Sequence, residues 1–205
     1  MQVFRREGLI FVVSFFSLLL IFKTQGVRAQ SKDSASVRAL LQQRDKEIKD
    51  LLGPKGTDYT QKQRDQLKNI INGIIDYRSM AKYALQGTYD TLSTDQKEEF
   101  VDLFSTIIRD QSLKKLDIYR AEVSYNSIKV NGDSATVKTV AQLDKVRTPV
   151  IYDMYYEEND HQWVVTDMVI DDVSTADSYR RQFQSIMRKK GYDGLLEILR
   201  KRVKR

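Results

Sequence analysis

The sequence predicts an α+β domain in which a four-stranded antiparallel curved sheet is wrapped by about six helices and encloses an apolar pocket. Apolar residues recur with helical spacing over residues 36–119 and again after residue 174. Between these regions, residues 122–170 alternate apolar and polar side chains and are rich in β-branched and aromatic types. Helices on both sides of a run of adjacent strands are typical of an α+β domain with one covered sheet face.

Residues 1–29 have the composition of a secretory signal peptide and are set apart from this domain. Arg5 and Arg6 precede an apolar run of 14 residues, and residues 27–29 have the small-x-small pattern of a cleavage site. The run is shorter than the roughly 20 residues that a helix needs to cross a bilayer. We therefore expect export, a cleaved signal over residues 1–29, and a single domain over residues 30–205.

Three helices are predicted before residue 90. The first covers residues 36–52 and stops at Gly53 and Pro54. The second is marked by five apolar residues between positions 67 and 75, and the third, a short one, covers residues 76–85.

A longer helix is predicted to begin at Ser93. Ser93 and Gln96 have the spacing of a capping box, in which the two side chains bind free backbone N–H groups. From Phe100 to Ile108, apolar residues at i, i+3, i+4, i+7 and i+8 form one broad stripe. We expect this helix to extend to about Tyr119.

Four strands are expected after this helix, over residues 122–130, 134–143, 149–157 and 162–170. Asn131 and Gly132 separate the first two strands and form the strongest short hairpin signal, because both turn positions need positive φ. A polar turn that contains His161 separates the last two. The strands therefore form an antiparallel meander.

The chain ends in helix, and this helix carries a basic tail. Ser174 and Asp177 have the spacing of a helix start, and Gly191 interrupts the helical pattern. Residues 188–205 contain eight Lys or Arg against Asp193 and Glu197. Such a tail fits anionic lipid headgroups or an acidic protein face, and it also fits a solvated helix face.

Residue types exclude most catalytic chemistry. The chain has no Cys and only one His, so it lacks a thiolate metal site and a Cys nucleophile, and no known catalytic motif is present. His161 lies in an expected surface turn. Asp153 and Asp167 leave a small enzyme of the ketosteroid-isomerase type as a minor alternative. We expect a protein that is not an enzyme and that holds no metal and no cofactor.

Several short segments resemble, in order, the MlaC/toluene-tolerance family of periplasmic phospholipid-binding proteins, which are auxiliary components of an ABC transporter. The segments are residues 76–81, 87–89, 92–96, 132–137, 163–168, 172–174, 179–183 and 191–195, together with Phe100 and Phe104. The chain departs from the family pattern at Gln86, where Leu is usual, and over residues 171–175, where Glu-Gly-Val-Ser-Leu is usual.

The resemblance implies a monomeric periplasmic carrier that buries the acyl chains of a phospholipid and leaves the headgroup in water. It implies two docking partners, an inner-membrane MCE-domain protein of an ABC transporter and an outer-membrane lipoprotein complex. Movement of lipid between them would maintain the lipid asymmetry of the outer membrane. No nucleic acid partner is expected for an exported protein.

The predicted lipid-binding residues are apolar side chains on the helical stripes and on one face of the strands. Met and aromatic residues suit a pocket for varied chains because they adapt or present broad apolar faces. On the strands, the choice of residues depends on which alternate side chains face inward, since a shift of one residue in the strand register would turn every chosen side chain outward. The candidates are Met80, Phe100, Phe104, Ile107, Ile108, Val137, Val150, Tyr152, Met154, Val165, Tyr179 and Phe183.

The same apolar pattern also fits an ordinary solid core, and on pattern alone the solid core is favoured. Two alternatives to a phospholipid carrier therefore stay open. One is a periplasmic interaction module that carries no lipid. The other is a carrier of a different apolar molecule, such as a hopanoid or an aromatic solvent.

Overall fold

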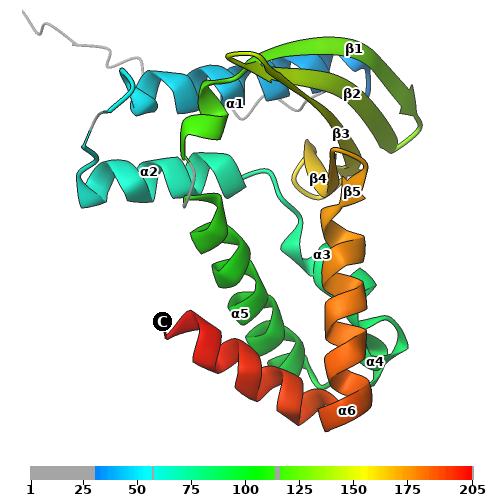
Figure 1. Cartoon of the computed structure of the whole chain (residues 1–205). Helices are drawn as coiled ribbons and strands as arrows, with labels where there is room; N and C mark the ends of the chain where they lie inside the picture. Colours follow the sequence, from blue (N-terminus) through cyan, green and yellow to red (C-terminus); the bar gives the residue numbers. More distant parts are fainter. Residues whose placement is uncertain (1–30, 57, 114–115, 205) are drawn as a thin grey trace, which may run out of the picture.

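The computed structural model describes residues 31–56, 58–113 and 116–204 and has the α+β architecture predicted from the sequence. The expected signal peptide lies outside the described residues. The sheet and α1 form one end of the molecule, and α5 and α6 extend away from it (Figure 1). The helices are α1 (Ser34–Leu52), α2 (Gln61–Asn72), α3 (Tyr77–Leu85), α4 (Gly87–Thr91), α5 (Thr94–Ser112), the 3-10 helix η1 (Leu116–Arg120) and α6 (Thr175–Val203).

The second predicted helix ends earlier than its apolar pattern suggests. α2 stops at Asn72, Ile74 lies in the turn that follows, and Ile75 forms an isolated β-bridge with Val165 of the sheet. The Val165 N–H donates to the carbonyl of Ile74 at 2.6 Å, and the Asp76 N–H donates to the carbonyl of Val165 at 2.9 Å. Both isoleucines pack against the sheet. Their spacing in the sequence also fits a helix, so the pattern alone could not separate packing on the sheet from a place in α2.

The capping box predicted at Ser93 and Gln96 is present. The Gln96 N–H donates to the Ser93 hydroxyl at 3.2 Å, and the Ser93 N–H donates to the Gln96 side chain at 2.9 Å. The predicted end of this helix is wrong, because α5 stops at Ser112 and η1 follows. In η1, Arg120 donates to the carbonyl of Pro54 at 3.1 Å and to the Tyr59 hydroxyl at 2.8 Å, which ties this segment to the connection between α1 and α2.

The sheet is an antiparallel meander of five strands in the order β1-β2-β3-β4-β5, one more than predicted. Its strands are β1 (Glu122–Asn131), β2 (Ser134–Leu143), β3 (Val146–Glu157), β4 (Gln162–Ile170) and β5 (Val173–Ser174). The two-residue turn before β5 is formed by Asp171 and Asp172, both at positive φ. The first hairpin turn is shifted by one residue from the prediction, because Asn131 pairs with Ser134 and only Gly132, with φ 58°, needs the left-handed region.

Strand register places one continuous set of side chains on the inner face of the sheet, which faces α1. Met154 pairs with Ala135 and Val165, Tyr152 pairs with Val137 and Met168, and Val150 pairs with Thr139 and Ile170. Bulges at the β1–β2 and β3–β4 pairings shift the register without moving these residues to the outer face. The predicted strand parity is therefore present in the structure.

Apolar side chains gather in separate clusters at the two ends of the molecule. Val37, Leu40 and Leu41 of α1 pack on the inner face of the sheet. A second cluster joins α3, α5 and α6, away from the sheet. Between the two clusters, the start of α6 lies against β4 and β5.

α6 is positioned by a carboxylate at its start and bent by a glycine within it. Asp167 of β4 accepts hydrogen bonds from the Ser174 hydroxyl at 2.6 Å and from the Ala176 N–H at 2.9 Å. Gly191 has φ 69° and ψ −178°, a conformation that side chains disfavour, and the helix turns sharply there (Figure 1). The bend returns the C-terminal half of α6 toward α5.

We predict that Asp167→Ala lowers the free energy of unfolding by about 2 kcal/mol, because it leaves the Ser174 hydroxyl and the Ala176 N–H without their acceptor. Urea unfolding followed by circular dichroism measures the change. Asp160→Ala, in the exposed β3–β4 turn, is the matched control and should alter stability by less than about 0.5 kcal/mol. Equal stability of the two variants would contradict this role of Asp167.

Candidate functional site

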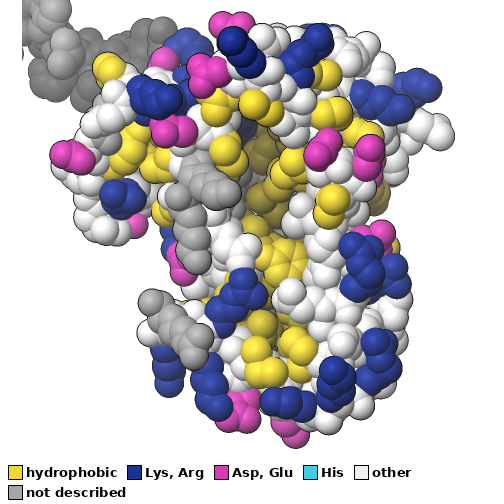
Figure 2. Space-filling model, viewed as in Figure 1, with side chains coloured by type: hydrophobic (Ala, Val, Ile, Leu, Met, Phe, Trp, Pro, Cys, Tyr) yellow, Lys and Arg dark blue, Asp and Glu magenta, His cyan; other side chains and the backbone are white. Residues whose placement is uncertain are grey.

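An open groove of about 450 Å³ lies where the end of the sheet meets α5 and α6. We call it the α5–α6 groove. Figure 2 shows a hollow on this face of the molecule, lined by apolar side chains between the sheet and the helices. The residues that line the groove are Gln111, Ile170, Val173, Thr175, Ser178, Tyr179, Gln182 and Arg202.

The groove continues onto the inner face of the sheet through Ile170. Ile170 pairs with Val150, and the next inner-face pair along the strands is Tyr152 with Met168. Tyr152 and Met168 pack against the cluster in which Val37, Leu40 and Leu41 cover the sheet, whereas Val150 and Ile170 lie outside that cluster. We call the inner face from Tyr152 to Ile170 together with the α5–α6 groove the cleft.

Polar groups on the cleft floor and beside it are either paired or strongly desolvated. The Thr139 hydroxyl is buried and donates to the carbonyl of Val150 at 2.9 Å. Burial raises the pKa of Tyr152, and it raises the pKa of two tyrosines near Tyr152, Tyr119 of η1 and Tyr125 of β1, to about 12. Such desolvation indicates a dry interior, which suits an apolar ligand more than a charged one.

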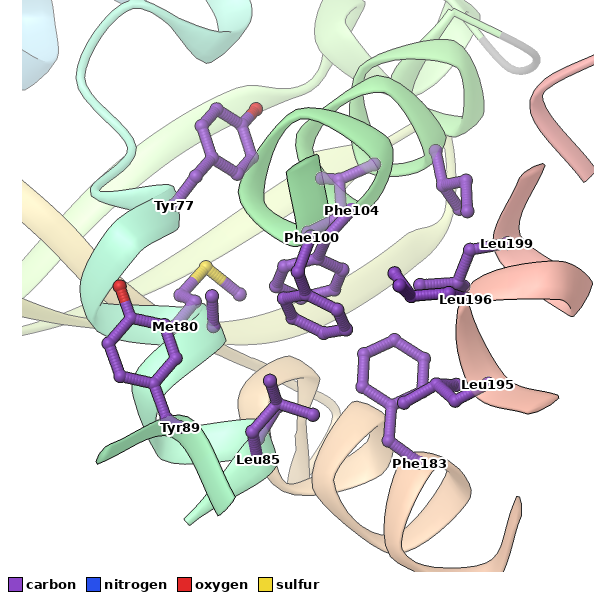
Figure 3. Close-up of a cluster of buried hydrophobic side chains, with 14 of the residues drawn as sticks. Tyr77, Met80, Leu85, Tyr89, Phe100, Phe104, Phe183, Leu195, Leu196 and Leu199 are labelled. Carbon is purple, nitrogen blue, oxygen red and sulfur yellow. The ribbon is translucent and has the colours of Figure 1, made fainter. Parts of the chain in front are cut away.

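A closed aromatic cluster separates the groove from the far end of the molecule. The Phe104 ring lies 4.9 Å from the Tyr179 ring and 5.4 Å from the Phe183 ring, and Phe100 lies 5.6 Å from Phe183. Phe100, Phe104 and Phe183 point toward one another and toward the leucines of the second half of α6 (Figure 3). The Tyr179 hydroxyl donates to Gln111 at 3.0 Å at the groove itself.

The twelve predicted lipid-binding residues fall into two groups rather than one pocket wall. Those on the sheet share its inner face and are Val137, Val150, Tyr152, Met154 and Val165. Those on the helices belong to or pack against the α3–α5–α6 cluster and are Met80, Phe100, Phe104, Ile107, Ile108, Tyr179 and Phe183. Of all twelve, Tyr179 alone lines the α5–α6 groove.

Sequence reasoning missed the residues that form the rim of the groove. Ile170 and Val173 flank the β4–β5 turn and are 43% and 56% exposed. Two apolar residues on either side of the polar pair Asp171 and Asp172 were the sequence signal that could have indicated this part of the rim. Arg202 reaches the groove from the end of the chain. No local sequence pattern predicts that Arg202 lies at the groove, because its position depends on the bend at Gly191.

The carboxylates considered for acid–base chemistry lie away from the cleft. Asp153 and Asp167 pair with each other on the outer face of the sheet. Asp153 accepts from the Thr136 hydroxyl at 3.0 Å beside a second hollow of about 460 Å³, which Met154 and Ser79 also line. Among the described residues there is no group of three His, Cys, Asp or Glu that could hold a metal ion.

These features define an α+β protein with an open, largely apolar cleft between a curved sheet and its helices. The chain belongs to the MlaC protein family, which matches residues 42–201. The resemblance recognised in the sequence is therefore confirmed.

The fold also matches that of a phospholipid-binding protein from Ralstonia solanacearum whose structure holds a phospholipid. The TM-score is 0.69 at 18% identity, over 84% of this chain and 97% of that chain. At this identity the likeness concerns the fold. No curated protein sequence matches the chain. None of the helices in the described part is long and apolar enough to cross a membrane.

We predict that the protein loses stability as the pH rises above the ordinary tyrosine pKa of about 10. The folded-state pKa of Tyr119 and Tyr125 is raised to about 12, so folding favours the neutral phenols. This contribution is complete below about pH 10 and is lost as the pH approaches 12. Urea unfolding between about pH 9 and pH 11, with tyrosinate absorbance, measures it.

The double variant Tyr119→Phe, Tyr125→Phe should lose less stability over this range. Tyr155→Phe removes a tyrosine that is 42% exposed and is the matched control. The same alkaline loss in the double variant and the wild type would contradict the desolvation of Tyr119 and Tyr125.

Proposed function

We propose that the protein is a periplasmic phospholipid carrier that holds acyl chains in the cleft. The observation that carries this proposal is membership of the MlaC family together with an apolar inner sheet face that opens into the α5–α6 groove. The fold of a phospholipid-binding protein from another organism supports it. The absence of a carboxylate from this face of the sheet favours binding over acid–base catalysis.

The physical chemistry of lipid transfer constrains how such a carrier works. Two chains of about 15 methylenes carry roughly 24 kcal/mol of desolvation, at about 0.8 kcal/mol per buried CH₂. This exceeds the roughly 20 kcal/mol at which non-covalent affinities saturate, so release into water is negligible. The competitor is a bilayer, which is equally apolar, and hand-over needs a partner that shields the chains.

The proposed partners are those that the family resemblance implies. They are an inner-membrane ABC transporter with an MCE-domain protein and an outer-membrane lipoprotein complex. Export by the signal peptide over residues 1–29 would bring the protein to the periplasm, between the two. Transfer of phospholipid between these complexes would maintain outer-membrane lipid asymmetry.

We predict that Val150→Asp abolishes phospholipid retention, because it places a carboxylate on the inner face where the chains would lie. Burial of an unpaired carboxylate costs several kcal/mol, which corresponds to a loss of at least roughly tenfold. The measurement is the lipid extracted per protein after incubation with phospholipid vesicles and separation. Met168→Asp, at a more exposed position on the same face, is a second variant.

Ile151→Asp is the matched control, since it adds the same charge to the same strand on the opposite face. It should retain lipid as the wild type does. Circular dichroism monitors folding of all variants. Normal lipid retention in folded Val150→Asp and Met168→Asp would contradict the cleft as the lipid site, and no uptake by the wild type would favour an interaction module without lipid.

A further inference from the structure

The rim of the α5–α6 groove carries one cation that its own helix leaves without a carboxylate partner. Arg202 lines the groove, and within the described part of the chain its guanidinium has no ion pair. The adjacent basic residues are occupied, because Arg200 pairs with Glu99 at 2.6 Å and Lys201 pairs with Glu197. Of three consecutive cations, the one directed to the groove is therefore the one available to a ligand.

Neutral hydrogen-bonding groups surround this cation. Gln111, Ser178 and Gln182 line the same groove. Arg202 is near enough to the Tyr179 hydroxyl to oppose the rise that burial causes in the Tyr179 pKa. An exposed arginine beside hydroxyl and amide groups, at the opening of an apolar cleft, matches the amphipathic pattern of a lipid whose polar head stays at the surface.

We propose that the rim of the α5–α6 groove is a headgroup site in which Arg202 binds the phosphodiester of the carried phospholipid. The proposal rests on the carrier function proposed above and adds a polar contact to it. A guanidinium suits this role because its planar set of donors matches phosphate oxygens in a bidentate geometry. The basic tail already suggested contact with anionic headgroups, but the sequence alone gave no reason to select Arg202, because it is one of eight basic residues there.

Two exposed aspartates in the turn beside the groove guide the choice of headgroup. Asp171 and Asp172 form the turn between Ile170 and Val173, both of which line the groove. A headgroup that joins an ammonium group to its phosphodiester would carry charges opposite both to Arg202 and to this turn. Phosphatidylcholine is therefore a suitable probe, and dioleoylglycerol offers the same two acyl chains without the phosphate.

The test is a competition within one sample. Wild type and Arg202→Gln are equilibrated with dioleoyl phosphatidylcholine vesicles that also contain dioleoylglycerol, and both lipids are extracted from the separated protein and quantified. We expect Arg202→Gln to lower the ratio of phosphatidylcholine to dioleoylglycerol about tenfold, the change expected for losing one charge-assisted hydrogen bond. Arg202→Lys keeps a point charge and should give an intermediate ratio.

Lys189→Gln is the matched control, because it removes one exposed positive charge from the same helix outside the groove. It should leave the ratio unchanged. An unchanged ratio in Arg202→Gln would overturn the headgroup site, even if uptake of both lipids fell, since an equal fall would place Arg202 in vesicle docking. Failure of the wild type to take up either lipid would instead overturn the carrier function itself.

Discussion

Burial of the inner face of the sheet is the constraint on which the rest of the structure depends. α1 covers part of this face with Val37, Leu40 and Leu41. The face continues from Tyr152, which packs against this cluster, to the pair Val150 and Ile170, and Ile170 lines the α5–α6 groove. Apolar surface in contact with water is unfavourable, and acyl chains in the cleft would complete the burial that α1 begins.

Two local features determine the position of α6, which lies opposite this face of the sheet. Asp167 joins the end of β4 to the first turn of α6, so the helix leaves the sheet from a fixed point. Gly191 then bends α6 back toward α5, where Leu195, Leu196 and Leu199 pack with Phe100 and Phe104. The aromatic cluster closes the far end of the molecule, and the rim near Tyr179 stays open.

The sequence predicted features that depend on short-range physics and missed those that depend on distant contacts. Alternation on β3 gave the correct face for Val150, Tyr152 and Met154, because side-chain direction has a fixed period of two. Ile74 and Ile75 were assigned to a helix because their apolar character, which serves packing on the sheet, resembles a helical stripe.

The residues at the rim of the cleft could not be predicted either, because their position also depends on distant contacts. Tyr179 could be selected from a helical stripe, whereas Arg202 meets it only after α6 has bent at Gly191. An arginine in a basic tail has no local signature that separates a groove residue from a solvated one. The pattern alone left a pocket and a solid core open, and the resemblance to the MlaC family, now confirmed as membership, favoured the pocket.

Native mass spectrometry of the protein from a periplasmic extract, prepared without detergent, tests the central claim most directly. The account predicts a species heavier than the mature chain by one phospholipid, with the same lipid recovered by organic extraction. A bare protein mass, together with no lipid uptake from vesicles, would contradict the carrier and indicate a solid-core interaction module. An adduct with the mass of a different apolar molecule would contradict the phospholipid and retain the cleft.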